Sequence, residues 1–178
     1  DSIFITNRQG EFEYVNPAFE KMTGYNAEAV AGRTPSVLKA KQQNPAAYSE
    51  LWETVLGKQT YRGTLVNRKH DGAIFFEEKV ITPLVNPAGQ ITHFVSTGRD
   101  ISERVKADED RARLNAILEA TTDIVAIADA TGTVVYVNKA GHSLLAEIKP
   151  DSSATEAASE LIGSALGQAE KHGVWERE

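Results

Sequence analysis

Short apolar runs separated by glycine-containing turns fill the first part of the chain. The runs SIFIT (2–6) and FEYVN (12–16) flank a turn that contains Gly10, which is typical of a β-hairpin. Asn16 ends the second run and can cap a short helix, with Pro17 at the first helical position, where a missing N–H costs nothing. The pattern therefore predicts strand, turn, strand and helix in this order.

Helices and three further strands are predicted downstream. Helical turns are expected up to Gly24 and Gly32, and a longer helix begins at Pro45 and ends at Gly57. Strand signals follow in three segments separated by glycine-containing turns: 60–72, 73–86 and 90–102. The order predicts an α+β fold with two strands, several helices and a three-strand meander.

The opening pattern occurs a second time, 122 residues later. Asp1, Ile5, Gly10, Tyr14, Val15, Asn16 and Ala18 fall on Asp123, Ile127, Gly132, Tyr136, Val137, Asn138 and Ala140. A period this long indicates a duplicated domain rather than a repeat array. We therefore expect a first domain at 1–103, a helical linker at 104–118 and a second, incomplete domain at 119–178.

The second copy is shorter than the first. From Asn16 to Tyr61 the positions differ by 45, whereas from Asn138 to Trp175, the expected counterpart, they differ by 37. The final strands of the pattern are also missing from it, which would leave an unpaired sheet edge. We expect this copy to be poorly ordered or to be completed by another chain.

A charged helix is predicted between the two copies. Ile101, Val105 and Ala112 trace part of a heptad, which Asp108 and Asn115 interrupt. Two interpretations remain open: a solvated connector, or a signalling helix through which two chains dimerise.

Composition narrows the possible functions. The formal net charge is −6 and no long Lys/Arg block occurs, which disfavours binding to nucleic acid or to anionic membranes. Cysteine is absent, so disulfides, thiolate catalysis and cysteinyl cofactor adducts are excluded. The apolar runs are shorter than a membrane span, and no signal peptide is recognised at the start. We expect a cytoplasmic protein, although a membrane anchor elsewhere in a longer parent protein stays possible.

Several separated motifs resemble the PAS domain family. They are FEYVNPAFEKMTGY (12–25), NRKHDG (67–72) and GRDISER (98–104), and the resemblance covers residues 1–104 well and 119–178 partly. It implies a five-stranded antiparallel sheet with short helices on one side, enclosing a ligand-sized cavity. It also implies a sensory module upstream of an output domain, such as a histidine kinase. At the junction with the output helix, Asp100 is expected to bond to local backbone or to a nearby arginine.

Residues 32–72 most resemble the flavin-binding redox sensors that control nitrogen fixation and methane oxidation. This resemblance implies non-covalent FAD. Asn67 matches a flavin-contacting Asn of the related blue-light flavin domains, and an amide offers a donor and an acceptor side by side to the edge of the flavin. The alternative is an inward strand residue that caps a neighbouring backbone group. Trp52 lies where the redox sensors carry a Trp, and would form either a cofactor wall or part of the core.

Other positions depart from the related blue-light flavin domains. Pro35 stands where their reactive cysteine would lie, so photo-adduct chemistry is excluded. Glu77 replaces a flavin-contacting Asn and Gly98 replaces a signalling Gln, which argues against light sensing. Ser36 replaces a phosphate-contacting Arg; two interpretations of Lys39, Lys41 and Arg33 remain open, contact with a pyrophosphate or plain solvation, which is usual for exposed lysines. The candidate cofactor-binding residues are Asn67, Trp52, Thr34, Ser36, Leu38, Lys39 and Glu77.

The sequence shows no pattern typical of a haem, metal or catalytic site. The predicted long helix has no axial histidine, and His70 and His93 lie in a turn and a strand. No convergent metal ligands, nucleophile with a base, or glycine-rich phosphate loop is visible. This fragment is therefore not expected to be an enzyme.

Two hypotheses follow. In the first, the chain is the cytoplasmic sensory region of a signalling protein, with a sensor histidine kinase as the expected parent. It reads redox state through FAD, relays it through the linker helix and forms a homodimer. In the second, it is a ligand-free dimerisation and interaction module whose cavity is filled by Phe4, Phe75, Phe94 and Met22.

Overall fold

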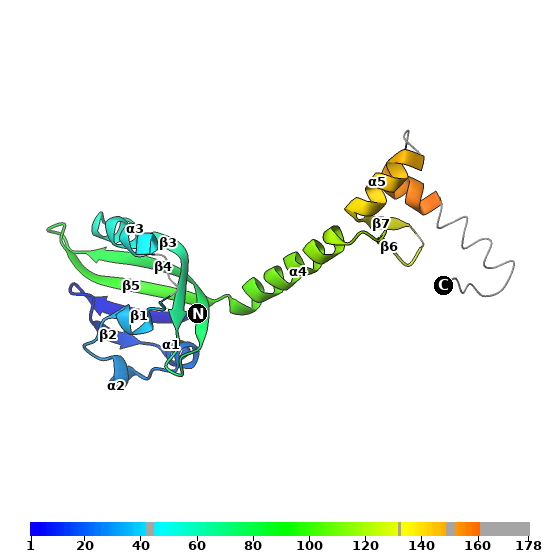
Figure 1. Cartoon of the computed structure of the whole chain (residues 1–178). Helices are drawn as coiled ribbons and strands as arrows, with labels where there is room; N and C mark the ends of the chain where they lie inside the picture. The colour runs from blue at the N-terminus through cyan, green and yellow to red at the C-terminus, as the bar shows by residue number, and fades with distance from the viewer. Residues whose placement is uncertain (42–44, 132, 149–151, 161–178) are drawn as a thin grey trace. The chain divides into compact units, whose positions relative to one another are not determined.

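The computed structural model describes residues 1–41, 45–131, 133–148 and 152–160 (Figure 1). The chain divides into two compact units, Asp1–Ala107 and Asp108–Glu178. The elements of the first unit are β1 (Ser2–Asn7), β2 (Phe12–Val15), α1 (Pro17–Thr23), α2 (Ala27–Val30), the 3₁₀ helix η1 (Pro35–Leu38), α3 (Pro45–Leu56), β3 (Tyr61–Arg68), β4 (Ile74–Val85) and β5 (Ile91–Asp100).

The first unit is built on a five-stranded sheet in the order β2-β1-β5-β4-β3, and every neighbouring pair is antiparallel. The last strand of this unit, β5, therefore lies in the middle of the sheet, between β1 and β4, and β2 and β3 are the edge strands. Ser2 pairs with Gly98, Gly98 with Lys79, and Lys79 with Gly63, so these four residues form one row across the sheet. The predicted α+β fold and five-stranded antiparallel sheet are confirmed.

Local chemistry sets the entry to α1 as the sequence predicts. Oδ1 of Asn16 accepts hydrogen bonds from the N–H groups of Phe19 (2.8 Å) and Ile3 (2.9 Å). The first bond satisfies an unpaired donor at the helix start, and the second ties the cap to β1. Gly24 then ends the helix at φ 76°, in the left-handed region that glycine adopts without strain.

Two apolar clusters lie between the sheet and the helices. The cluster around α1 consists of Phe4, Phe12, Val15, Phe19, Val30 and Leu38. The cluster under α3 consists of Leu51, Val55, Tyr61, Leu65 and Phe94. Side chains alternate between the two faces of a strand, so the buried residues of β1, β3, β4 and β5 share one face of the sheet. The helices cover this face. Members of both clusters line the candidate site.

The predicted charged helix is confirmed: the segment 102–121 reads as helical in sequence, and α4 covers Ser102–Ala120. None of its side chains is buried among the described residues. The N–H of Ile101 donates to the carbonyl of Phe76 (2.9 Å), which ties the start of the linker to β4.

The second unit repeats the opening of the first. It contains β6 (Ala126–Ala128), β7 (Val134–Val137), α5 (Lys139–Ile148) and a helical segment at 154–160. In the first copy Phe4 pairs with Val15 and Ile5 with Tyr14; in the second, Ala126 pairs with Val137 and Ile127 with Tyr136. Both hairpins shift register at the same place, between Ile5 and Thr6 and between Ile127 and Ala128.

The cap is duplicated as well. Oδ1 of Asn138 accepts from the N–H groups of Val125 (3.0 Å) and Gly141 (3.0 Å), the counterparts of Ile3 and Phe19. Its Nδ2 donates to the carbonyls of Asp123 (2.8 Å) and Leu118 (3.0 Å), and the residue is fully buried. The predicted duplication is confirmed. The expected counterpart of Tyr61, Trp175, lies outside the described residues, as does Gly132, and the expected incompleteness of this copy stays a prediction.

Candidate functional site

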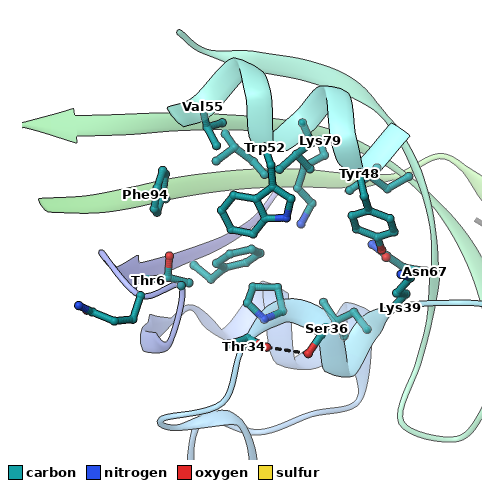
Figure 2. Close-up of a pocket in the computed structure, with 18 residues that line it drawn as sticks. Thr6, Thr34, Ser36, Lys39, Tyr48, Trp52, Val55, Asn67, Lys79 and Phe94 are labelled. Atoms are coloured by element: carbon teal, nitrogen blue, oxygen red, sulfur yellow. Dashed lines mark hydrogen bonds between the residues drawn. The ribbon is translucent and has the colours of Figure 1, made fainter. Parts of the chain in front are cut away.

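A pocket of about 320 Å³ lies between the inner face of the sheet and the helices of the first unit (Figure 2). It is lined by Phe4, Thr6, Gln9, Gly10, Thr34, Pro35, Ser36, Leu38, Lys39, Tyr48, Leu51, Trp52, Val55, Leu65, Asn67, Lys79, Ile81 and Phe94. Ten of these 18 residues have aliphatic or aromatic side chains, and seven have polar or charged ones. A concave, mainly apolar site of this size with a few polar groups is typical of small-molecule binding.

The segment around η1 forms one wall. Oγ of Ser36 and Oγ1 of Thr34 are 2.6 Å apart in a hydrogen bond, and both side chains are exposed. The backbone of Lys39 pairs with that of Asn67 in an isolated bridge, which fastens this segment to β3. The ammonium group of Lys39 lies 4.7 Å from the ring centroid of Tyr48 on α3. Hydroxyl groups and a cation therefore stand at the exposed part of the pocket.

Trp52 lies on α3 against the same space. Its side chain is 45% exposed, so it is not a core residue, and its ring meets that of Phe94 edge-on at 6.1 Å. Of the two alternatives raised by the sequence, the structure places Trp52 in the pocket wall (Figure 2). A half-exposed indole offers a flat apolar surface to a ligand.

Asn67 belongs to a buried polar chain. Its Nδ2 donates to Oε2 of Glu77 (2.6 Å), and Oε1 of Glu77 lies 2.7 Å from Nζ of Lys79. The second contact is an ion pair rather than a well-aligned hydrogen bond, since Oε1 has no partner of hydrogen-bond geometry. Nζ of Lys79 also lies 4.5 Å from the ring centroid of Phe4. Asn67 thus uses one N–H within the protein, instead of offering its whole amide edge to a ligand.

Glu77 and Lys79 each stabilise the charged form of the other. Burial lowers the pKa of the Lys79 ammonium group, and the charge and contact of Glu77 oppose that fall. Burial, with the charge of Glu77 as a smaller cause, raises the pKa of Tyr48, which remains a neutral phenol near pH 7. A buried charge persists only with such a partner.

Glu77 does not line the pocket, in contrast to its predicted place among the cofactor-binding residues. Its side chain is fully buried and is packed against the backbone of Gly98. A Cβ atom at position 98 would lie 2.7 Å from Cδ of Glu77 and closer still to Oε1. The two departures from the blue-light domains are therefore coupled: the larger acid at 77 uses the space that glycine leaves at 98.

Six of the seven predicted site residues line the pocket: Thr34, Ser36, Leu38, Lys39, Trp52 and Asn67. Arg33 and Lys41 do not, and neither do Phe75 and Met22, two of the residues expected to fill a closed cavity. Phe4 and Phe94 line the space without filling it. Lys79 and Tyr48 were not predicted. Glu77 and Lys79 are two residues apart in a predicted strand, so they must share one face of it. This spacing of opposite charges was a sequence signal for an ion pair on that face.

The junction with the linker differs from expectation in one partner. Oδ1 of Asp100 accepts from the N–H (2.9 Å) and hydroxyl (2.5 Å) of Ser102, as expected for local bonding. Its side-chain partner is Lys69, at 3.4 Å, rather than an arginine. Partial burial would raise the pKa of Asp100, but the bonds from Ser102 and Lys69 outweigh it, so the pKa lies below its usual value.

Metal-ligand clusters and membrane-spanning helices are both absent from the described part of the chain. No group of three or more His, Cys, Asp or Glu side chains gathers there as metal ligands would. None of the helices described is both long and apolar enough to cross a bilayer.

Comparison with known proteins identifies relatives in signalling. The chain is 32% identical over 151 residues to the nitrogen fixation regulatory proteins of Klebsiella oxytoca and Klebsiella pneumoniae, covering 82% of this chain and 30% of each relative. It is 30% identical over 106 residues to a blue-light-activated histidine kinase of Brucella abortus, covering 57% of this chain and 22% of that protein. The chain thus spans less than a third of these relatives.

Solved structures give the same picture. An RNA-binding light-oxygen-voltage receptor matches with a TM-score of 0.58 and 29% identity, over 65% of this chain and 34% of the receptor. The LOV domain of the Erythrobacter litoralis EL346 blue-light activated histidine kinase matches with a TM-score of 0.53 and 28% identity, over 57% of this chain and 95% of the domain. Family models described as PAS domain match residues 1–103 and 112–175. With these matches and a five-stranded antiparallel sheet around a lined pocket, the chain belongs to the PAS domain family.

Proposed function

We propose that this chain is a sensory region of a cytoplasmic signalling protein and that its first PAS domain binds FAD non-covalently to report redox state. The observation that carries the proposal is the pocket: apolar walls, a half-exposed indole and a buried amide surround a space of about 320 Å³. The relatives named nitrogen fixation regulatory proteins share the pocket-bearing region and support a regulatory role.

The residues fit a flavin. Leu38, Leu51, Val55 and Leu65 supply apolar surface for a planar aromatic ring, and Asn67 supplies a hydrogen-bonding amide at the buried side. Lys39, with the hydroxyl groups of Thr34 and Ser36, supplies the exposed polar side, which suits a phosphate-bearing tail. When bound, the flavin would supply a centre that accepts electrons and changes its protonation.

The protein would respond through its own hydrogen bonds. A change in what the pocket offers to Asn67 alters the bond from Asn67 to Glu77 on β4. Strand β4 is tied to the linker by the bond from Ile101 to Phe76 and by the N–H of Phe76, which donates to Ser102 Oγ (2.9 Å). Two sheet arrangements with different affinities for the two ligand states would then be populated differently. A coupling of about 1–3 kcal/mol suffices.

The rest of the proposal concerns the parent protein. We propose that the linker helix passes the signal to a downstream domain of the same protein, with a sensor histidine kinase as the output, and that two chains associate through the PAS domain or the linker. The histidine kinase among the relatives supports this output.

Reconstitution tests the cofactor. The purified chain is incubated with FAD, freed of excess ligand by gel filtration and examined by absorption spectroscopy. If the chain binds FAD, we expect a yellow protein whose flavin bands are bleached by dithionite and return in air. A chain that stays colourless contradicts the proposal and favours a ligand-free interaction module. In parallel, Lys39→Met should weaken binding of FAD and FMN but not of riboflavin, which lacks phosphate.

A further inference from the structure

Lys79 occupies an unusual place for a lysine. It lies in the middle of β4 with a neighbouring strand on each side, and its side chain is only 3% exposed on the inner face. Lysine is almost never fully buried without a partner. Its neighbours across the sheet are two glycines, Gly63 and Gly98, and the space over them is taken by the side chains of Tyr61 and Glu77.

The ion pair is oriented with its cation toward the pocket. Lys79 is a lining residue, whereas Glu77 is not, because the carboxylate occupies the space over Gly98 and accepts from Asn67. Figure 2 shows the side chain of Lys79 pointing from the sheet into the pocket. The pocket therefore meets the positive end of the pair.

No other charge in the described lining cancels this one. The remaining charged or titratable groups there are Lys39, which is exposed, and Tyr48, a phenol; none of the lining residues described is a carboxylate. Phe4 lies under the ammonium group and cannot neutralise it, although its ring face attracts the cation. The electrostatic bias of the pocket is thus toward ligands that gain negative charge.

We propose that Lys79 sets the reduction potential of the bound flavin by favouring its reduced, electron-rich state. This inference rests on the function proposed above. Reduction takes two electrons from a low-potential donor, dithionite in the assay, and one proton from water. The neutral oxidised ring then carries one net negative charge, which the ammonium group of Lys79 offsets. Glu77 keeps the proton on that amine against the effect of burial.

The experiment compares midpoint potentials of the whole chain loaded with FAD. Lys79→Met removes the cation, and Glu77→Gln/Lys79→Met removes both charges, so that no lone buried carboxylate affects the result. Lys79→Arg retains the charge. Lys21→Met, in α1 and outside the pocket, controls for a change in net charge. Far-ultraviolet circular dichroism and the bound flavin spectrum establish that each variant is folded and loaded.

Both variants that lack the cation should bind reduced FAD about ten- to a hundredfold more weakly relative to oxidised FAD. This ratio lowers the two-electron potential by about 30 mV per tenfold. The pH dependence of the potential should show one proton taken up per two electrons in the wild type and more than one without Lys79. Lys79→Arg and Lys21→Met should resemble the wild type.

The possible failures are distinguishable. A chain that takes up no FAD overturns the proposed function and this inference together. A chain that binds FAD with the same potential and proton uptake in all variants leaves the proposed function standing and overturns the role of Lys79. A shift in Lys79→Met that is absent from Glu77→Gln/Lys79→Met also overturns it, because the effect would then come from the unpaired carboxylate.

Discussion

Adding one methyl group at Gly98 should destabilise the first domain strongly, because the space beside it is already taken. The Cβ of an alanine would lie 2.7 Å from Cδ and 3.2 Å from Cγ of Glu77. The carboxylate cannot move without leaving Asn67 (2.6 Å) or Lys79 (2.7 Å). Overpacking of a core costs about 1–3 kcal/mol. Weakening a hydrogen bond to a charged group adds about 1.5–3 kcal/mol. We expect a total loss of about 2.5–6 kcal/mol in the free energy of unfolding.

Urea unfolding of the apo protein measures this loss. The chain has two tryptophans, so a Trp175→Phe background makes fluorescence report on Trp52 and hence on the first domain. Gly98→Ala is introduced into that background and also into one that carries Glu77→Ala/Lys79→Met. In the second background the carboxylate is gone, and the same substitution should cost less than about 1 kcal/mol because the new methyl group enters vacated space. Equal costs in the two backgrounds would refute the packing of Glu77 over Gly98.

Three further results are expected. Asn138→Ala removes the side-chain bonds to Val125, Gly141 and Asp123, and should lower the stability of the second unit by about 2 kcal/mol or more, seen as faster hydrogen exchange there and unchanged exchange in the first unit. Asp100→Asn should cost about 0.2–1 kcal/mol near neutral pH, since the ion pair is partly exposed. The folded-state pKa of Asp100 is depressed, so its contribution is present above the unfolded pKa of about 3.9 and is lost as pH falls through the folded value. Urea midpoints of wild type and Asp100→Asn should therefore converge in acid, and a constant gap would contradict the assignment.

Local signals in the sequence were enough for the elements and for the duplication. Asn16 with Pro17 marks a helix start because capping depends on a few adjacent residues, and the capping Asn, without the proline, recurs at Asn138. The strands and their order along the chain were predicted from apolar runs between turns. The charged segment 102–121 likewise predicted a helix, and α4 ends within one residue of that segment because helix ends are uncertain by one or two residues.

The candidate site was only partly predictable. Resemblance located Asn67 and Trp52, but the partners of these residues depend on which strands become neighbours. Gly98 lies beside Lys79 only because β5 pairs with β4, and the packing of Glu77 over Gly98 follows from that register. A single sequence does not give the register, so Glu77 was expected in the pocket wall and Lys79 was not expected there at all. The exposure of Trp52 likewise depends on how α3 lies over the sheet.

The most direct test of the account is a titration of Trp175→Phe protein with FAD, followed by the fluorescence of Trp52. If the pocket binds FAD, the fluorescence of Trp52 should be quenched and the quenching should saturate at one FAD per chain, since Trp52 lies in the pocket wall. A Val55→Phe variant, which fills part of the same pocket, should bind FAD more weakly by at least about tenfold while keeping its circular dichroism spectrum. Fluorescence that does not respond to FAD, or quenching that is equally tight in Val55→Phe, would contradict the claim that this pocket holds the flavin.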